Sequence, residues 1–220
     1  MVLGLLMKML MTKQLKFEGG NISLKNITMT LMPSFLTAEI TKYFMKENNM
    51  PKLYLLSWYW GFVLVKQVDQ KFNLKKSDEI YSLGMELGEA MGIGIYKTHD
   101  YYPGRYTHFV IPNNPFMKYF TPEDKSKGPI DYFISGCMAG GGCHVHSALC
   151  QNVEIKCQAT GNQECEFLTA TEKELKDRGL WDIAVQRYDL NNIMPIQKEI
   201  YEEYSESNEA KLLSKIVDEL

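Results

Sequence analysis

The sequence predicts an α+β fold, in which helices pack against an antiparallel sheet. Residues 53–65, LYLLSWYWGFVLV, form the most apolar run of the chain and are typical of a buried helix. Residues 15–31 and 94–109 instead carry alternating apolar, β-branched and aromatic residues around Gly-Gly-Asn and Pro-Gly turns, which indicates hairpins. A third hairpin is expected over 153–171, around a Gly-Asn turn.

Three helices are expected between the first two hairpins. The first covers 33–46 and opens with a Pro-Ser pair. The second covers about 53–72, and because it is apolar on nearly all sides, it must be covered on nearly all sides. Ser77 is the expected N-cap of the third helix, over 78–91, which ends at Gly92.

A proline- and glycine-rich segment, 112–129, is most simply a surface loop whose aromatic residues could cover an opening. The segment that follows, 130–150, has helical length although it carries glycines at 136 and 140–142. Each interior glycine costs a helix about 1 kcal/mol relative to alanine. We therefore expect these glycines to permit close packing or the close approach of another group.

The C-terminal part, 171–220, is predicted to be a mostly polar helical extension of one ligand-binding domain that spans residues 1–220. Thr171 and Glu174 have the spacing of a capping box at its start. The expected anchors of this extension to the core are Trp181, Ile183 and Tyr188.

Composition excludes several classes of protein. A net charge of -3 and a pI near 5.9 provide no broad positive field for nucleic acid. Residues 53–65 are shorter than the roughly 18 residues that a transmembrane helix needs. The N-terminal run MVLGLLMKMLM is interrupted by Lys8 and no cleavage site follows, so it predicts a packed or dimer-forming helix rather than a targeting segment. Five cysteines, an odd number, favour a reducing cytoplasm.

The third hairpin carries Glu154, Cys157 and Cys165, and thiolates and carboxylates are zinc ligands. The turn between the two cysteines can bring both thiols to one ion. Glu154 precedes Cys157 by three residues, so a β-bulge is required to turn both to the same side. On spacing alone, the alternative is equally good: both cysteines are small, buried, apolar residues.

A family resemblance shifts this balance. The order of residues over 130–170 resembles the C-terminal signature of the 4-vinyl reductase domain family, which includes archaeal predicted hydrocarbon-binding proteins and the sensor domains of phenol-responsive transcription activators. The matching residues are Gly136, Gly140, Glu154, Cys157, Gly161, Cys165 and Phe167. The resemblance implies an α+β fold like that of core TRAPP vesicle-tethering subunits and of NO-signalling ligand-binding domains.

The same resemblance implies a structural zinc ion beside a ligand pocket. In the sensor domains, a cysteine before the glycine-bearing helix completes the zinc site, and its position falls on Asp131 in this sequence. The expected metal ligands are therefore Asp131, Glu154, Cys157 and Cys165. His146 and Cys150 compete with Asp131 for the fourth position.

The ligand implied by the resemblance is a small aromatic, acyl or other hydrophobic molecule. The expected pocket residues are Trp60, Tyr106, His108, Phe109, Phe133 and Met138. The alternative is that these side chains only fill the core.

No nicotinamide, flavin or phosphate-binding motif is present in the sequence. The leading hypothesis, which the family resemblance implies, is a cytoplasmic, homodimeric binding protein, a sensor or carrier without catalytic residues. The alternatives are a reductase acting on a vinyl group of a tetrapyrrole precursor, and an assembly subunit.

Overall fold

The structure is a computed structural model that describes residues 9, 11–18, 21–30, 32–74, 76–205 and 207–219. The predicted N-terminal helix lies outside the described residues, except for Met9 and Met11. Among the described residues, no helix combines the length and the apolarity needed to cross a membrane.

The N-terminal strands form a small three-stranded antiparallel sheet rather than the predicted two-stranded hairpin. Its strands are β1 (Leu15–Glu18), β2 (Asn21–Leu24) and β3 (Ile27–Met29), in the order β1-β2-β3. The additional turn is made by Lys25 and Asn26, which both have positive φ angles, 46° and 70°. Two central residues with positive φ suit the twist of a tight hairpin. The sequence gives little indication of this turn because it contains no glycine.

The main sheet has four antiparallel strands in the order β4-β5-β7-β6. They are β4 (Lys97–Tyr102), β5 (Tyr106–Ile111), β6 (Cys150–Lys156) and β7 (Cys165–Thr171). The predicted second and third hairpins are thus confirmed, the second with Gly104 at a positive φ of 75° in its turn.

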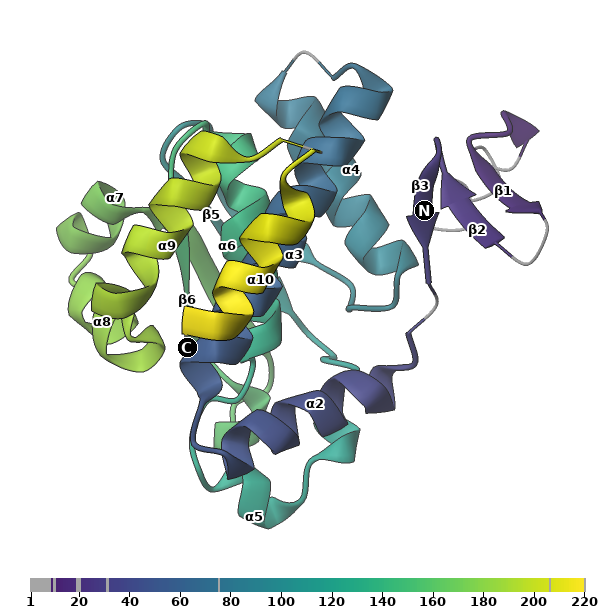
Figure 1. Cartoon of the computed structure of the whole chain (residues 1–220). Coiled ribbons are helices and arrows are strands. Elements are labelled where there is room, and N and C mark those ends of the chain that lie inside the picture. Colours follow the sequence, from purple (N-terminus) through teal and green to yellow (C-terminus); the bar gives the residue numbers. More distant parts are fainter. Residues whose placement is uncertain are drawn as a thin grey trace.

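Helices cover this sheet and separate it from the small one (Figure 1). The predicted helices are present, although Ser77 is the first helical residue and Lys76 the N-cap. The long helices α3 and α6 run side by side, and α10 lies across α3 (Figure 1). The helices are α2 (Ser34–Lys46), α3 (Met50–Phe72), α4 (Ser77–Ala90), α5 (Pro122–Lys125), α6 (Tyr132–His146), α7 (Glu172–Asp177), α8 (Trp181–Tyr188), α9 (Leu190–Glu203) and α10 (Glu209–Glu219).

Two expectations about the C-terminal half need correction. The segment 112–129 is not a simple surface loop, because it forms a 3₁₀ turn and α5, and it buries Phe116, Met117 and Phe120. In the C-terminal extension, Tyr188 is buried as predicted, but Ile183 is 42% exposed and is not a buried anchor. Tyr188 stacks on Tyr54 of α3, with ring centroids 4.0 Å apart.

Glycines allow α3 and α6 to approach at backbone distance. A Cβ atom at Gly136 would stand 2.3 Å from the carbonyl oxygen of Tyr54, and one at Gly61 would stand 2.1 Å from that of Cys137. No side chain fits in such a space. Gly136 therefore provides the close packing that the sequence predicted, and Gly61, which was not part of that prediction, provides it from α3.

Candidate metal centre and ligand cavities

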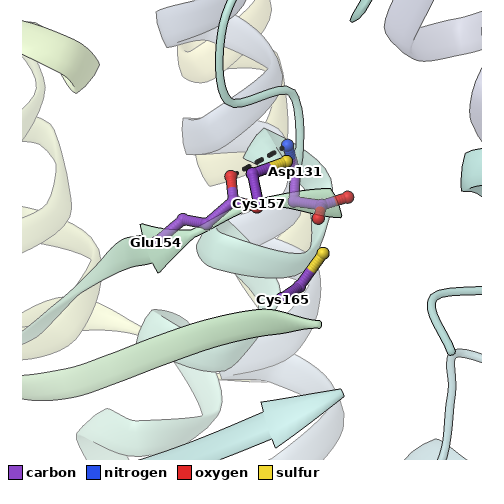
Figure 2. Close-up of side chains that lie close together, drawn as sticks. All are labelled: Asp131, Glu154, Cys157 and Cys165. Carbon is purple, nitrogen blue, oxygen red and sulfur yellow. Dashed lines mark hydrogen bonds between the residues drawn. The ribbon is translucent and has the colours of Figure 1, made fainter. Parts of the chain in front are cut away.

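Four buried side chains, two carboxylic acids and two thiols, meet at one end of the main sheet (Figure 2). They belong to Asp131, Glu154, Cys157 and Cys165, and one potential ligand atom from each lies within 4.8 Å of the other three. Each of the four residues is at most 4% exposed. The residues predicted as metal ligands therefore lie together.

The local structure explains how residues far apart in sequence converge. Asp131 is the N-cap residue of α6, and Cys165 begins β7. In the β6–β7 register Glu154 pairs with Phe167 whereas Lys156 pairs with Glu166, so one residue bulges out between them. This confirms the predicted bulge, which brings Glu154 and Cys157 to the same side.

Asn114, which the sequence analysis missed, holds two of these side chains in place. Its Nδ2 donates a hydrogen bond of 2.8 Å to Asp131 Oδ2 and lies 3.7 Å from Cys165 Sγ. The backbone N–H of Gln158 also donates to Cys165 Sγ, at 3.3 Å. Donors of this kind stabilise a charged ligand and orient it toward a metal.

The cluster concentrates negative charge in a buried place. Burial raises the pKa of Asp131 and, together with the charge of Asp131, raises the pKa of Glu154 well above its ordinary value. A hydrogen bond from the Cys165 thiol lowers the pKa of Cys157 to about 7, whereas the same bond and burial raise the pKa of Cys165. Glu154 Oε2 accepts a bond from the N–H of Asp131, but Oε1 has no partner among the described residues.

These residues fit a divalent cation. An unpartnered buried carboxylate oxygen is costly without a compensating group. Tetrahedral zinc with bonds of 2.0–2.3 Å requires ligand atoms roughly 3.3–3.8 Å apart. The four potential ligand atoms lie within 4.8 Å of one another, so the longest distances between them need to shorten by only about 1 Å. Two thiolates and two carboxylates suit zinc or a similarly borderline metal.

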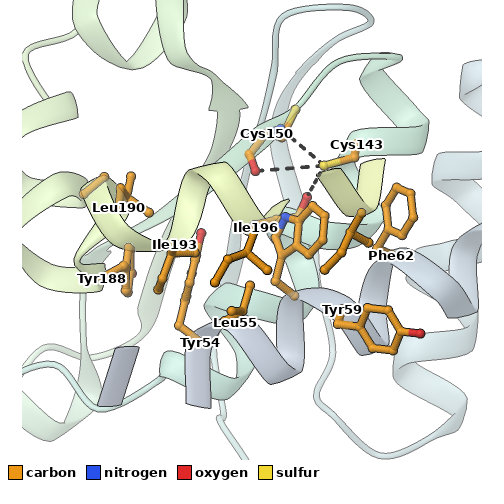
Figure 3. Packing of buried hydrophobic residues seen from close by; sticks show 14 of the residues in the cluster. Tyr54, Leu55, Tyr59, Phe62, Cys143, Cys150, Tyr188, Leu190, Ile193 and Ile196 are labelled. Carbon is orange, nitrogen blue, oxygen red and sulfur yellow. Dashed lines mark hydrogen bonds between the residues drawn. The ribbon is translucent and has the colours of Figure 1, made fainter. Parts of the chain in front are cut away.

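His146 and Cys150, the alternatives to Asp131 as the fourth metal ligand, lie elsewhere. His146 Nε2 lies 3.1 Å from Thr107 Oγ1. Cys150 donates its backbone N–H to Cys143 Sγ at 3.3 Å, within an apolar core between α3, α6 and α9 (Figure 3). Asp131, and neither His146 nor Cys150, therefore lies with the hairpin ligands.

Two apolar cavities adjoin one another next to α4. The inner cavity, of about 80 Å³, lies between α3, α4, α6 and the main sheet. The large cavity, of about 450 Å³, lies between the small sheet, the start of α2, Trp60 of α3 and the end of α4. Leu87, Met91 and Ile93 line both cavities and form the wall between them.

Four of the six predicted pocket residues line these cavities. Phe109 and Met138 line the inner cavity, whereas Trp60 and Phe133 line the large one. Of these residues, Phe109 is connected to the metal cluster, because it stacks on Phe167, which pairs with Glu154.

Tyr106 and His108 line neither cavity, which corrects the prediction for both. Successive residues of a strand point to opposite faces of the sheet. Because Thr107 and Phe109 line the inner cavity, Tyr106 and His108 point away from it. The Arg178 guanidinium lies 4.0 Å from the ring centroid of Tyr106, and His108 Nε2 lies 2.7 Å from a carboxylate oxygen of Glu166.

Comparison with known proteins shows the fold. No family model matches the chain, and no curated protein matches it. Among solved structures it is similar to the phenol-responsive sensory domain of the transcription activator PoxR, crystallised with phenol. That similarity has a TM-score of 0.56 at 15% identity and covers 77% of this chain and 92% of the PoxR domain.

A trafficking protein particle complex subunit 3 from Naegleria fowleri, covalently bound to palmitic acid, matches with a TM-score of 0.47 at 16% identity. That match covers 62% of this chain and 93% of the subunit. The antiparallel sheets packed against helices, together with the match to the PoxR domain, confirm the α+β fold predicted from the sequence. At such identities the likeness concerns the fold alone.

Proposed function

We propose that the protein binds a small hydrophobic molecule in the inner cavity, beside a structural zinc ion. The observation that carries this proposal is an apolar cavity between α3, α4, α6 and the main sheet, beside the tightly packed α3–α6 pair. Gly61 and Gly141 line it, and among its described lining residues the polar side chains are the hydroxyl-bearing Tyr81, Thr107 and Thr169 and the thiol-bearing Cys137. Pockets for apolar ligands have this composition, mostly apolar walls with a few polar groups.

The size of the inner cavity points to a ligand with a single ring. A cavity of about 150 Å³ is known to hold benzene, and this one measures about 80 Å³. Met85, Met91 and Met138 line it, and methionine side chains adapt their shape readily. We expect them to shift when a ring of the size of phenol or toluene enters.

The zinc ion would be held by Asp131, Glu154, Cys157 and Cys165. It would neutralise the buried carboxylates and tie the β6–β7 hairpin to the start of α6. Because α6 forms one wall of the inner cavity through Met138 and Gly141, this tie supports the shape of the cavity. The zinc ion has no catalytic part in this proposal.

The proposal also includes the family relationship, the role in the cell and the oligomeric state. The segment 130–170 resembles the 4-vinyl reductase domain family, and we propose that the chain is a divergent relative acting as a cytoplasmic sensor or carrier. We also propose a homodimer, because α2 exposes apolar side chains: Phe35 is 51% and Tyr43 is 61% exposed. The mass of the native protein, one chain or two, tests the dimer directly.

Ligand binding can be tested by NMR on protein with ¹³C-labelled methionine methyl groups, titrated with phenol and with toluene. We expect saturable shifts of the Met85 and Met138 signals. In the variant Gly84→Leu the new side chain enters the inner cavity, since a Cβ there meets no atom within 4 Å, and the shifts should disappear. The matched control, Ser82→Leu, places the same side chain on the exposed face of α4 and should bind normally. Unchanged binding in Gly84→Leu would refute the inner cavity as the site.

Metal binding can be tested by native mass spectrometry of protein purified without chelator. We expect one zinc ion per chain, lost in Glu154→Ala, Cys157→Ala and Cys165→Ala. The control is Cys143→Ala, because Cys143 lies in the apolar core away from the cluster. A folded wild-type protein that takes up no metal from added zinc would contradict the proposed site.

A further inference from the structure

We propose that the large cavity is a second ligand site, which takes an uncharged, predominantly apolar molecule with one polar oxygen, such as a long-chain alcohol. This site is separate from the inner cavity of the proposed function and does not depend on it. Its volume of about 450 Å³ falls within the range of roughly 300–1,000 Å³ that is usual for ligand pockets.

Aromatic and methionine side chains form much of the wall. Trp60 lies against Phe133, with ring centroids 5.7 Å apart, and Phe116 meets Phe133 edge to face at 6.3 Å. Met29 and Met91 line the cavity from the small sheet and from the end of α4. Rigid rings beside flexible thioethers make a surface that accepts apolar molecules of varied shape.

The charge of the ligand follows from the lining. None of the described lining residues carries a charged side chain. A carboxylate or an ammonium group inside this cavity would lose its hydration without gaining a counter-charge, which is strongly unfavourable. We therefore expect the ligand to be uncharged.

The polar groups of the cavity gather at one place. Its hydroxyl side chains are those of Thr30, Ser34 and Thr37, just before α2 and within its first turn. Thr37 is only 3% exposed. The N–H of Leu36 in this turn already donates to the carbonyl oxygen of Pro33, at 2.9 Å. Pro33, the N-cap residue of α2, provides no side-chain hydrogen bond to the other N–H groups at the start of the helix. A hydroxyl or carbonyl oxygen of a ligand would find donors here.

The cavity also has an entrance. Phe17 of β1 and Met32 before α2 both line it, yet they are 61% and 42% exposed. Large apolar side chains that line a cavity and also face solvent mark its mouth. A ligand can therefore enter between the small sheet and the start of α2.

The test uses the full-length protein and N-phenyl-1-naphthylamine, an uncharged fluorescent probe. We expect saturable binding of one probe per chain, displaced by 1-dodecanol at a concentration at least tenfold lower than by dodecanoate at pH 8. Equal displacement by the alcohol and the carboxylate would overturn the uncharged class of ligand. Probe binding that does not saturate would overturn the site itself.

Two variants assign the binding to this cavity. Ala90→Trp, at the end of α4, fills the large cavity and should weaken probe binding at least tenfold. Gly84→Leu, six residues earlier on the same helix, fills the inner cavity instead and should leave probe binding within twofold of wild type. The opposite pattern would overturn the assignment.

Thr37→Val tests the same site without filling the cavity. The substitution removes the hydroxyl group and nearly preserves the volume of the side chain. We expect this variant to bind 1-dodecanol three- to tenfold more weakly and to bind the probe as wild type does. Unchanged affinity for the alcohol would contradict the role of the hydroxyl groups at the start of α2.

Discussion

Asn114 donates a hydrogen bond of 2.8 Å to the carboxylate of Asp131, and through this bond a residue outside the β6–β7 hairpin fixes the one metal-ligand candidate that the hairpin does not supply. The same side chain accepts a hydrogen bond from the N–H of Phe116, at 3.0 Å, through Oδ1. Phe116 lines the large cavity. Asn114 thus connects the candidate metal centre to the wall of the proposed second ligand site.

Replacement of Asn114 by alanine should weaken zinc binding by about 10- to 100-fold, because the Asp131 carboxylate loses the donor that orients it. Zinc affinity can be measured by competition with a chelator of known affinity. Asn113→Ala is the matched control, since the neighbouring side chain is exposed. Equal affinities of the two variants would show that the hydrogen bond has no part in metal binding.

Asp131→Cys should strengthen zinc binding at least tenfold, because a thiolate is a better ligand for zinc than a carboxylate. Asp131→Asn should weaken it, because the amide removes the negative charge and leaves the shape almost unchanged. The same chelator competition measures both. If the two variants change zinc affinity in the same direction, Asp131 is not a ligand.

Gly140→Ala should destabilise the protein by about 3 kcal/mol or more, because a Cβ there would stand 1.9 Å from the carbonyl oxygen of Trp58 and the helices would have to separate. Gly84→Ala is the matched control in another helix. A Cβ at Gly84 meets nothing within 4 Å, so this change should stabilise by about 0.5–1 kcal/mol. Urea unfolding gives both values, and a destabilisation below about 1 kcal/mol for Gly140→Ala would contradict the close contact.

The sequence could predict those residues of the metal cluster that lie close together in the chain. Cys157 and Cys165 flank one turn, and the required bulge follows from the spacing of Glu154. Asp131 was placed only through a family resemblance, because no periodicity connects the start of α6 to the hairpin. Asn114 gave no signal, since an asparagine in a proline-rich segment is typical of an exposed turn, whereas this one is buried by a tertiary contact.

The sequence analysis expected one apolar pocket, whereas the structure has two apolar cavities. The period of two along β5 could have separated His108 from Phe109, because adjacent strand residues cannot share one face. The large cavity depends on the small N-terminal sheet, which packs against α4 through a long-range hydrophobic cluster that contains Leu24 and Leu87. The turn at Lys25 and Asn26 completes that sheet without glycine, so its third strand could not be read from turn residues.

Protonation of His146 should destabilise the protein in acid. Burial lowers the pKa of this histidine to about 4, from an ordinary value of 6.5. The folded state therefore disfavours the charged ring, so its contribution to stability is complete above pH 6.5 and is lost as the pH falls toward 4. The ring lies 3.1 Å from Thr107 Oγ1 and 6.1 Å from the centroid of the Tyr101 ring.

The variant His146→Gln cannot take up this proton, so its free energy of unfolding should fall less than that of wild type between pH 6.5 and pH 4. The difference should reach up to roughly 3 kcal/mol, the free energy that corresponds to lowering the pKa from 6.5 to about 4. Urea unfolding at several pH values in this range measures it. His144, whose pKa burial also lowers to about 4, keeps part of the acid sensitivity in the variant. Parallel profiles for His146→Gln and wild type would mean that the imidazole at position 146 is not held neutral by the fold.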